Sequence, residues 1–84
     1  MEKKLDVKMV MRVFEKIRTH GQKTAEGYKL SGVEAISDFD GYTIFLKNKE
    51  VTLTLFFHHR YDVKFTKIKA FDDFIQQLKK LDHF

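Results

Sequence analysis

Apolar residues near the N-terminus recur every three or four positions, which is the spacing of one face of an α-helix. The pattern predicts a helix over residues 6–20. Asp6 is its expected N-cap, because a carboxylate can accept a hydrogen bond from an otherwise unpaired backbone N–H. The apolar positions span about half of the circumference, so we expect deep burial; they are Val7, Met9, Val10, Met11, Val13, Phe14 and Ile17. Gly21 follows and is expected to take the left-handed conformation that often ends a helix.

After a polar loop at residues 22–27, the pattern changes to the alternation of half-buried β-strands. Strands are predicted over residues 28–30, 33–39, 42–47 and 51–57. Ser31-Gly32 is a turn or a bulge between the first two. Asp40-Gly41 is the strongest hairpin signal, since a tight two-residue turn needs positive φ at both central positions. Asn48-Lys49 is a weaker signal of the same kind.

The two hairpin turns give compatible strand registers. A tight turn at Asp40-Gly41 places Ala35 opposite Leu46, and one at Asn48-Lys49 places Leu46 opposite Val51. Both registers put the same apolar set on one face, namely Tyr42, Ile44, Leu46, Val51, Leu53 and Leu55. A one-residue slip in either hairpin would break this agreement, so we predict an antiparallel meander.

The alternation resumes at Tyr61, Val63 and Phe65. These residues are either a fourth strand or the end of one long bent strand that begins at Val51. Residues 67–81 then predict a second helix with Thr66 as N-cap. Its apolar face consists of Ile68, Phe71, Phe74, Ile75, Leu78 and Leu81.

The predicted fold class is α+β, with a helix, a three- to four-stranded antiparallel β-meander and a C-terminal helix. Both helices should pack on one sheet face, because their apolar stripes need a partner there. The 84 residues are enough for one domain, residues 1–84.

Composition narrows the class of protein further. No apolar run approaches the roughly 20 residues of a membrane-spanning helix, and the N-terminus has no signal-peptide pattern, so we expect a cytoplasmic protein without a membrane contact. The absence of cysteine excludes disulfides, thiolate metal sites and cysteine nucleophiles. Sixteen basic and twelve acidic residues give a net charge of +4, which favours acidic partners only mildly.

Candidate catalytic and metal-binding motifs have simpler structural interpretations. The acidic loop before Gly41 lacks the ligand pattern of an EF-hand, because aligning that glycine puts Ile36 and Lys47 at the first and last ligand positions. His58 and His59 would point to opposite faces of a strand, so they cannot share an ion while extended. No serine lies in a nucleophile elbow, and no glycine-rich phosphate loop is present. We therefore expect no catalytic site, no metal and no cofactor.

Two surfaces remain as candidates for binding. The predicted registers place Ile36 opposite Phe45 on the face away from the helices, and Phe56 opposite Gly41 on that same face. This pattern favours a non-enzymatic protein-interaction module, either a homodimer through the open sheet face or a complex with another protein. The alternative is weak nucleic-acid binding through a basic stripe along the first helix, formed by Lys4, Lys8, Arg12 and Lys16. An ordinary solvated helix face explains the same stripe, so nucleic acid is not the favoured partner.

The segment from Ser37 to Thr43, followed by Val51 to His58, resembles a family of small uncharacterised bacterial proteins defined only as a domain of unknown function. The size and the helix–meander–helix order agree with that family over nearly the whole chain. The resemblance implies a bacterial cytoplasmic protein, and it carries no activity, ligand or catalytic residue.

Overall fold

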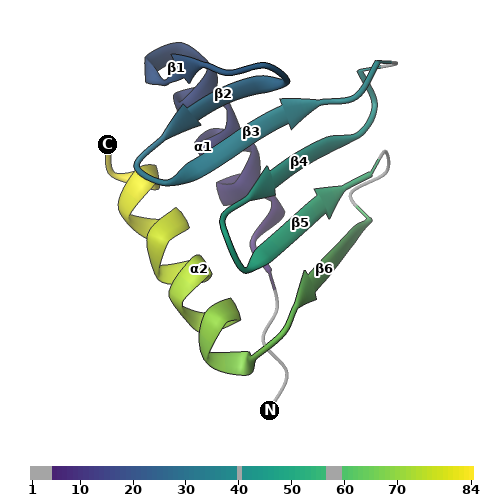
Figure 1. The fold of residues 1–84 in the computed structure, drawn as a ribbon, viewed down its shortest axis with the longest axis vertical. Helices are drawn as coiled ribbons and strands as arrows, with labels where there is room; N and C mark the ends of the chain where they lie inside the picture. The colour runs from purple at the N-terminus through teal and green to yellow at the C-terminus, as the bar shows by residue number, and fades with distance from the viewer. Residues whose placement is uncertain (1–4, 40, 57–59) are drawn as a thin grey trace.

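The computed structural model describes residues 5–39, 41–56 and 60–84. Two helices and a six-stranded antiparallel sheet make up the fold, and the strands follow chain order from β1 to β6 across the sheet (Figure 1). The elements are α1 (Val7–His20), β1 (Gln22–Lys23), β2 (Gly27–Leu30), β3 (Val33–Ser37), β4 (Ile44–Lys47), β5 (Val51–Leu55), β6 (Tyr61–Phe65) and α2 (Ile68–Asp82). The α+β class is confirmed, whereas the predicted three to four strands are too few.

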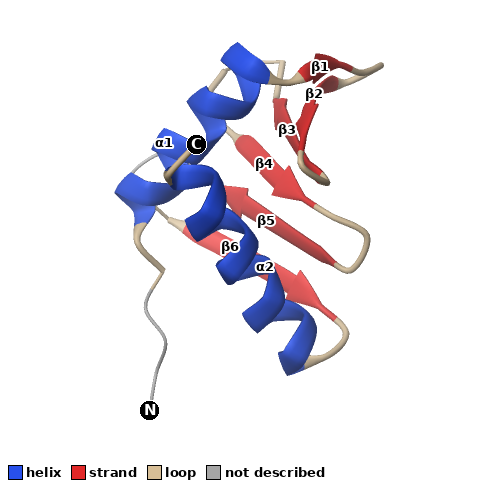
Figure 2. Ribbon diagram, turned by 90° about the vertical axis from the view of Figure 1, so that its left-hand side faces the viewer, coloured by secondary structure: helices blue, strands red, loops and turns tan. Residues whose placement is uncertain are grey.

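Both helices lie on the same side of the sheet (Figure 2). They divide that side between them, since α1 lies against β2 and β3 while α2 contacts β5, β6 and α1. The buried helix residues and alternate residues of β3, β4 and β5 form a single core, which includes Ile17, Leu46, Leu53 and Phe74. We call the side of the sheet away from the helices the open face. From β2 to β6 it carries Lys29, Glu34, Ile36, Phe45, Lys47, Thr52, Thr54, Asp62 and Lys64.

Helix α1 begins as predicted, because the Met9 N–H donates to Oδ1 of Asp6 at 3.2 Å. The helix ends at His20, as predicted, but the left-handed conformation expected of Gly21 is wrong. Gly21 has φ −83° and ψ 174°, which is extended backbone that any residue can adopt. Glycine is needed there for space, since a Cβ would lie 2.5 Å from the carbonyl oxygen of Ile17 and 2.6 Å from that of Lys29.

The segment expected to be a polar loop contains the short strand β1, which pairs with β2. Thr24 closes the turn between them: its N–H donates to the Gly27 carbonyl at 2.7 Å, and its hydroxyl accepts from the Gly27 N–H at 2.9 Å. The prediction failed because β1 has no apolar residue to reveal a period. The next turn is as expected, since Ser31 and Gly32 have φ of 50° and 83° and join β2 to β3.

The hairpin between β3 and β4 has the predicted register, with Ala35 opposite Leu46. Its strands are shorter than expected, so Phe39 and Tyr42 lie outside the ladder and are exposed. Tyr42 is therefore not part of the buried core. Gly41 has φ 78°, as a tight turn requires, and Asp40 lies outside the described residues.

The register between β4 and β5 differs from the prediction by two residues. Leu46 lies opposite Leu53, not opposite Val51. The reason is that Asn48 starts the turn instead of occupying its centre: its N–H donates to the Val51 carbonyl at 3.0 Å, and its Oδ1 accepts from the N–H groups of Glu50 and Val51 at 2.9 Å each. A shift of two residues leaves every side chain on its original face.

Strand β6 is separate from β5 and pairs with it antiparallel, so the alternative of one long bent strand is wrong. Phe57, His58 and His59, which the predictions included, lie outside the described residues. Helix α2 begins at Ile68 with Lys67 as N-cap and no side-chain capping bond, so the Thr66 prediction is also wrong. Ile68 is exposed, because the first turn of α2 lies at the end of the edge strand (Figure 1).

Candidate functional site

The open face brings together the three residues predicted as a partner surface. Ile36 and Phe45 are direct cross-strand neighbours and both are half-buried. Phe56 is 44% exposed and lies two positions beyond Thr54, which is the neighbour of Phe45 on β5. The register places Thr43 beside Phe56, so the predicted cover of Gly41 by Phe56 is wrong. We call Ile36, Phe45 and Phe56 the apolar patch.

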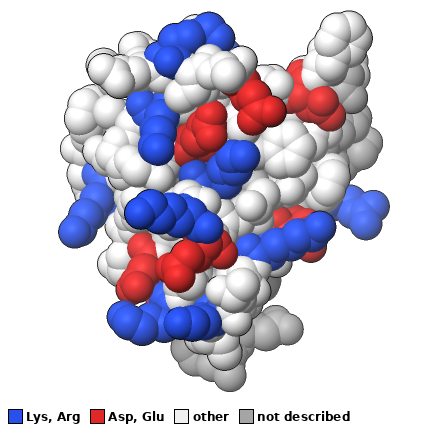
Figure 3. Space-filling view, viewed as in Figure 1, with Lys and Arg blue, Asp and Glu red and all other residues white. Residues whose placement is uncertain are grey.

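Charged residues of both signs are interleaved over the open face (Figure 3). One row of paired positions runs from Lys29 through Glu34, Lys47 and Thr52 to Lys64. Glu34 accepts a hydrogen bond from the Thr24 hydroxyl at 2.7 Å. The three lysines have no ion-pair partner within residues 5–39, 41–56 and 60–84. This row, which we call the basic row, is therefore able to attract an acidic group.

The basic stripe of α1 is largely an interhelical contact. Arg12 donates two hydrogen bonds of 2.9 Å to the carboxylate of Asp82 at the end of α2. Lys16 donates to the Asp82 carbonyl oxygen, and its Nζ lies 4.0 Å from Oδ1 of the same residue. Lys8 is exposed, and Lys4 lies outside the described residues. Two cations of the stripe thus hold the C-terminus of α2 against α1.

The electrostatics of this contact follow from its geometry. The hydrogen bonds from Arg12, with smaller effects from the charges of Arg12, Lys16 and His83, lower the pKa of Asp82 below its ordinary value. The same hydrogen bonds raise the pKa of Arg12. Both shifts favour the ionised pair, which is the behaviour of a structural ion pair and not of a proton-transfer site.

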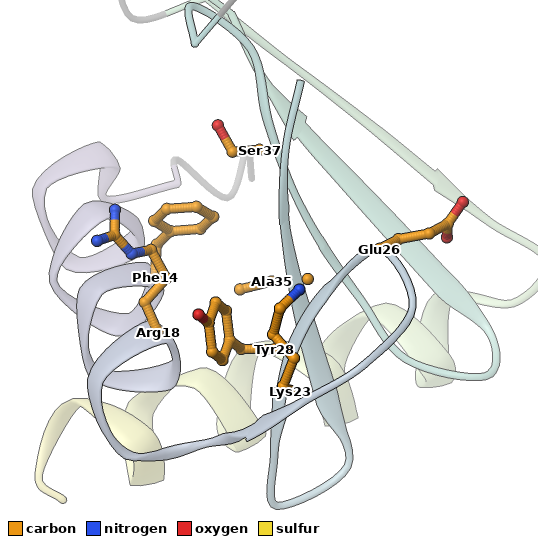
Figure 4. Close-up of a pocket in the computed structure, with 8 residues that line it drawn as sticks. Phe14, Arg18, Lys23, Glu26, Tyr28, Ala35 and Ser37 are labelled. Atoms are coloured by element: carbon orange, nitrogen blue, oxygen red, sulfur yellow. The ribbon is translucent and has the colours of Figure 1, made fainter. Parts of the chain in front are cut away.

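A hollow of about 270 Å³ opens between α1 and the end of the sheet formed by β1 to β3 (Figure 4). Phe14 and Arg18 line it from the helix, and Lys23, Tyr28 and Ser37 line it from the strands. Glu26 points away from its centre (Figure 4). Lys23 is already placed over the Tyr28 ring, 5.4 Å from the centroid, and Arg18 lies 3.8 Å from Glu15. Among the described residues that line it, the hollow therefore offers cations and hydroxyls, and its carboxylate, that of Glu26, points away from Ser37.

The described residues include neither a metal-binding cluster nor a membrane-spanning helix. No group of three or more histidine, cysteine, aspartate or glutamate side chains there could hold a metal ion. No helix among them has both the length and the apolar character needed to cross a bilayer.

Two features of these surfaces were missed from the sequence. Asp82 is 70 residues away from Arg12, and no local pattern connects them. The basic row could have been found, because alternation assigns Glu34 and Lys47 to the same face as Ile36 and Phe45. Its full extent depended on β2 and β6, whose pairing the sequence left open.

Comparison with known proteins adds one finding. Residues 5–83 match the model of a family described as a protein of unknown function, DUF3081. No curated protein and no solved structure matches the chain.

Proposed function

The chain belongs to the DUF3081 family of proteins of unknown function, and from that premise we propose that it is a non-enzymatic module that binds a protein partner on its open face. One observation carries the proposal: Ile36 and Phe45 are neighbours on a sheet face that neither α1 nor α2 covers. An exposed apolar patch with a charged rim is typical of protein–protein contact sites.

The partner we propose is an amphipathic helix with acidic residues along one flank. Its apolar stripe would lie on Ile36, Phe45 and Phe56, beside the basic row. The lysines of that row lie on β2, β4 and β6, so successive ones are about 9–10 Å apart at the usual strand spacing. Acidic side chains seven residues apart on a helix are separated by about 10.5 Å, which matches this interval.

The test is an NMR titration of the isotope-labelled chain with a designed helical peptide that has leucines on one face and glutamates seven residues apart on its flank. We expect amide shifts centred on β3, β4 and the end of β5. A control peptide with lysine in place of each glutamate should bind at least about tenfold more weakly, because it meets the basic row with like charge.

Variants of the protein locate the contact. Phe45→Glu should weaken peptide binding by about tenfold or more, since it places a charge in the centre of the apolar patch. Lys47→Glu should weaken binding of the acidic peptide and strengthen binding of the basic one. Lys8→Glu, an equal charge change on α1, is the matched control and should leave the affinity unchanged. Shifts confined to α1, or no difference between the two peptides, would refute the proposal.

A further inference from the structure

Strand β6 forms one edge of the sheet, and no strand of the described chain lies beyond it. It is five residues long, whereas β1 at the opposite edge has two residues. Native proteins usually shorten or cover such an edge, because its unpaired N–H and C=O groups invite another chain. The aromatic residues at its two ends remain exposed, Tyr61 at 41% and Phe65 at 42%.

From the sequence and pairing of this edge we propose that β6 binds β6 of a second copy, antiparallel and centred on Val63, so that two sheets join into one of twelve strands. This inference concerns a different surface from the open-face proposal and does not rest on it.

The backbone of β6 has the correct groups directed outward. The Phe56 N–H donates to the Arg60 carbonyl at 2.6 Å, so the polar backbone groups of Arg60 point toward β5. Since these groups alternate along a strand, those of Asp62 and Lys64 also point toward β5. The N–H and C=O groups of Tyr61, Val63 and Phe65 therefore point away from the sheet. On the other side of β5, the Asn48 N–H donates to the Val51 carbonyl, so the polar backbone groups of Val51 point toward β4. Those of the next residue of β5 therefore point toward β6, which agrees with the same alternation.

The side chains of β6 are self-complementary about Val63. In an antiparallel pair centred there, Asp62 lies opposite Lys64 of the second copy, and Lys64 lies opposite its Asp62. Tyr61 lies opposite Phe65 in the same way. Because the outward backbone groups belong to the odd-numbered residues, Asp62 and Lys64 occupy non-hydrogen-bonded pairs, in which side chains approach most closely. Neither has an ion-pair partner within the described part of one chain.

The same charges select this register over its neighbours. Centring the pair on Asp62 places that carboxylate opposite its own copy and Lys64 opposite Arg60. Centring it on Lys64 places the two lysines together. A single lysine on an edge strand discourages pairing, but an acid and a base placed symmetrically about Val63 favour one partner and one alignment.

The residues on the helix side of β6 extend the contact beyond backbone pairing. Tyr61, Val63 and Phe65 alternate with the charged residues and lie on that side, where Phe65 stacks on Phe71 at a centroid separation of 5.1 Å. In the dimer each Phe65 meets the partner's Tyr61, an aromatic cross-strand pair of the kind that stabilises sheets.

The test is sedimentation equilibrium of the full chain from micromolar to near-millimolar concentration, with charge variants. We expect the wild type to dimerise. Asp62→Lys and Lys64→Asp should each raise the dissociation constant by roughly tenfold or more, because each makes two like-charge pairs. An equimolar mixture of these two single variants should recover the dimer, since every cross-strand pair is then opposite in charge. The variant carrying both changes should also dimerise.

Hydrogen exchange of the wild type gives a second readout. The amides of Asp62 and Lys64 should be protected at all concentrations, and those of Tyr61, Val63 and Phe65 only where the dimer forms. Phe45→Glu should leave the dimer intact, which separates this contact from the open-face proposal. A monomeric wild type at near-millimolar concentration would overturn the inference, and so would a dimer that both charge reversals leave unchanged.

Discussion

Helix α2 offers a direct comparison between two positions of one apolar stripe. Phe74 and Ile68 both fit the helical period, yet Phe74 is 0% exposed and Ile68 is 73% exposed. Truncating Phe74 to alanine removes a ring from the contact between the helices and the sheet. The lost transfer free energy and the cavity left behind together amount to about 3–5 kcal/mol for such a substitution. Ile68→Ala removes a side chain that is already mostly hydrated, so its effect should stay within about 0.5 kcal/mol.

The loss at Phe74 is large relative to the whole protein. At about 0.05–0.15 kcal/mol per residue, a chain of 84 residues has a free energy of unfolding of roughly 4–13 kcal/mol. Phe74→Leu, which keeps most of the volume and should cost on the order of 1–2 kcal/mol, provides a variant that remains folded. Urea denaturation followed by circular dichroism, with equal m-values, measures each difference. Equal losses for Ile68→Ala and Phe74→Ala would refute the assigned packing of α2.

Three further predictions concern contacts at the ends of elements. The lowered pKa of Asp82 means that its stabilising effect is complete above the ordinary value of 3.8 and is lost as the pH falls through the lower folded value. The difference in Tm between wild type and Asp82→Asn should therefore be constant from pH 5 to 7 and shrink below about pH 4. Gly21→Ala should lower the free energy of unfolding by about 1–3 kcal/mol, because the added Cβ would lie 2.5 Å from a carbonyl oxygen. Gly41→Asn should cost less, because a Cβ added there has no atom within 4 Å and asparagine tolerates the φ of that position. Urea denaturation measures both differences. Asn48→Ala removes the acceptor of two backbone N–H groups and the donor of a 3.0 Å bond to Gln77, so it should cost about 1–2 kcal/mol by the same measurement, against little change for Lys49→Ala.

The sequence was sufficient for the features that depend on local periodicity. The alternation of Leu53 and Leu55 with threonine requires one face of β5 to be buried, and the structure buries both. Ile36 and Phe45 were placed opposite each other on the other face, which the pairing of β3 with β4 confirms. The limits of α1 followed in the same way from Asp6 and the apolar repeat.

The errors arose where a local signal had two interpretations or where no local signal was present. Asn48 is equally compatible with the first and with a central position of a turn, and only its bonds to Glu50 and Val51 distinguish them. Gly21 suggested a left-handed cap, although the tight approach of Lys29 from β2 is what requires glycine. Strand β1 has no apolar residue, so nothing in its composition marked it as paired.

Periodicity by itself determined which face of an element each side chain occupies, because a period of two or 3.6 residues is a property of the local backbone. Only the tertiary structure decided which distant groups meet, since that depends on how the elements are placed after the chain turns. Asp82 reaches Arg12 because the last turn of α2 lies beside α1, and β6 is an edge because the sheet ends there. The apolar patch belongs to the first kind of information, and the unpaired edge of β6 belongs to the second.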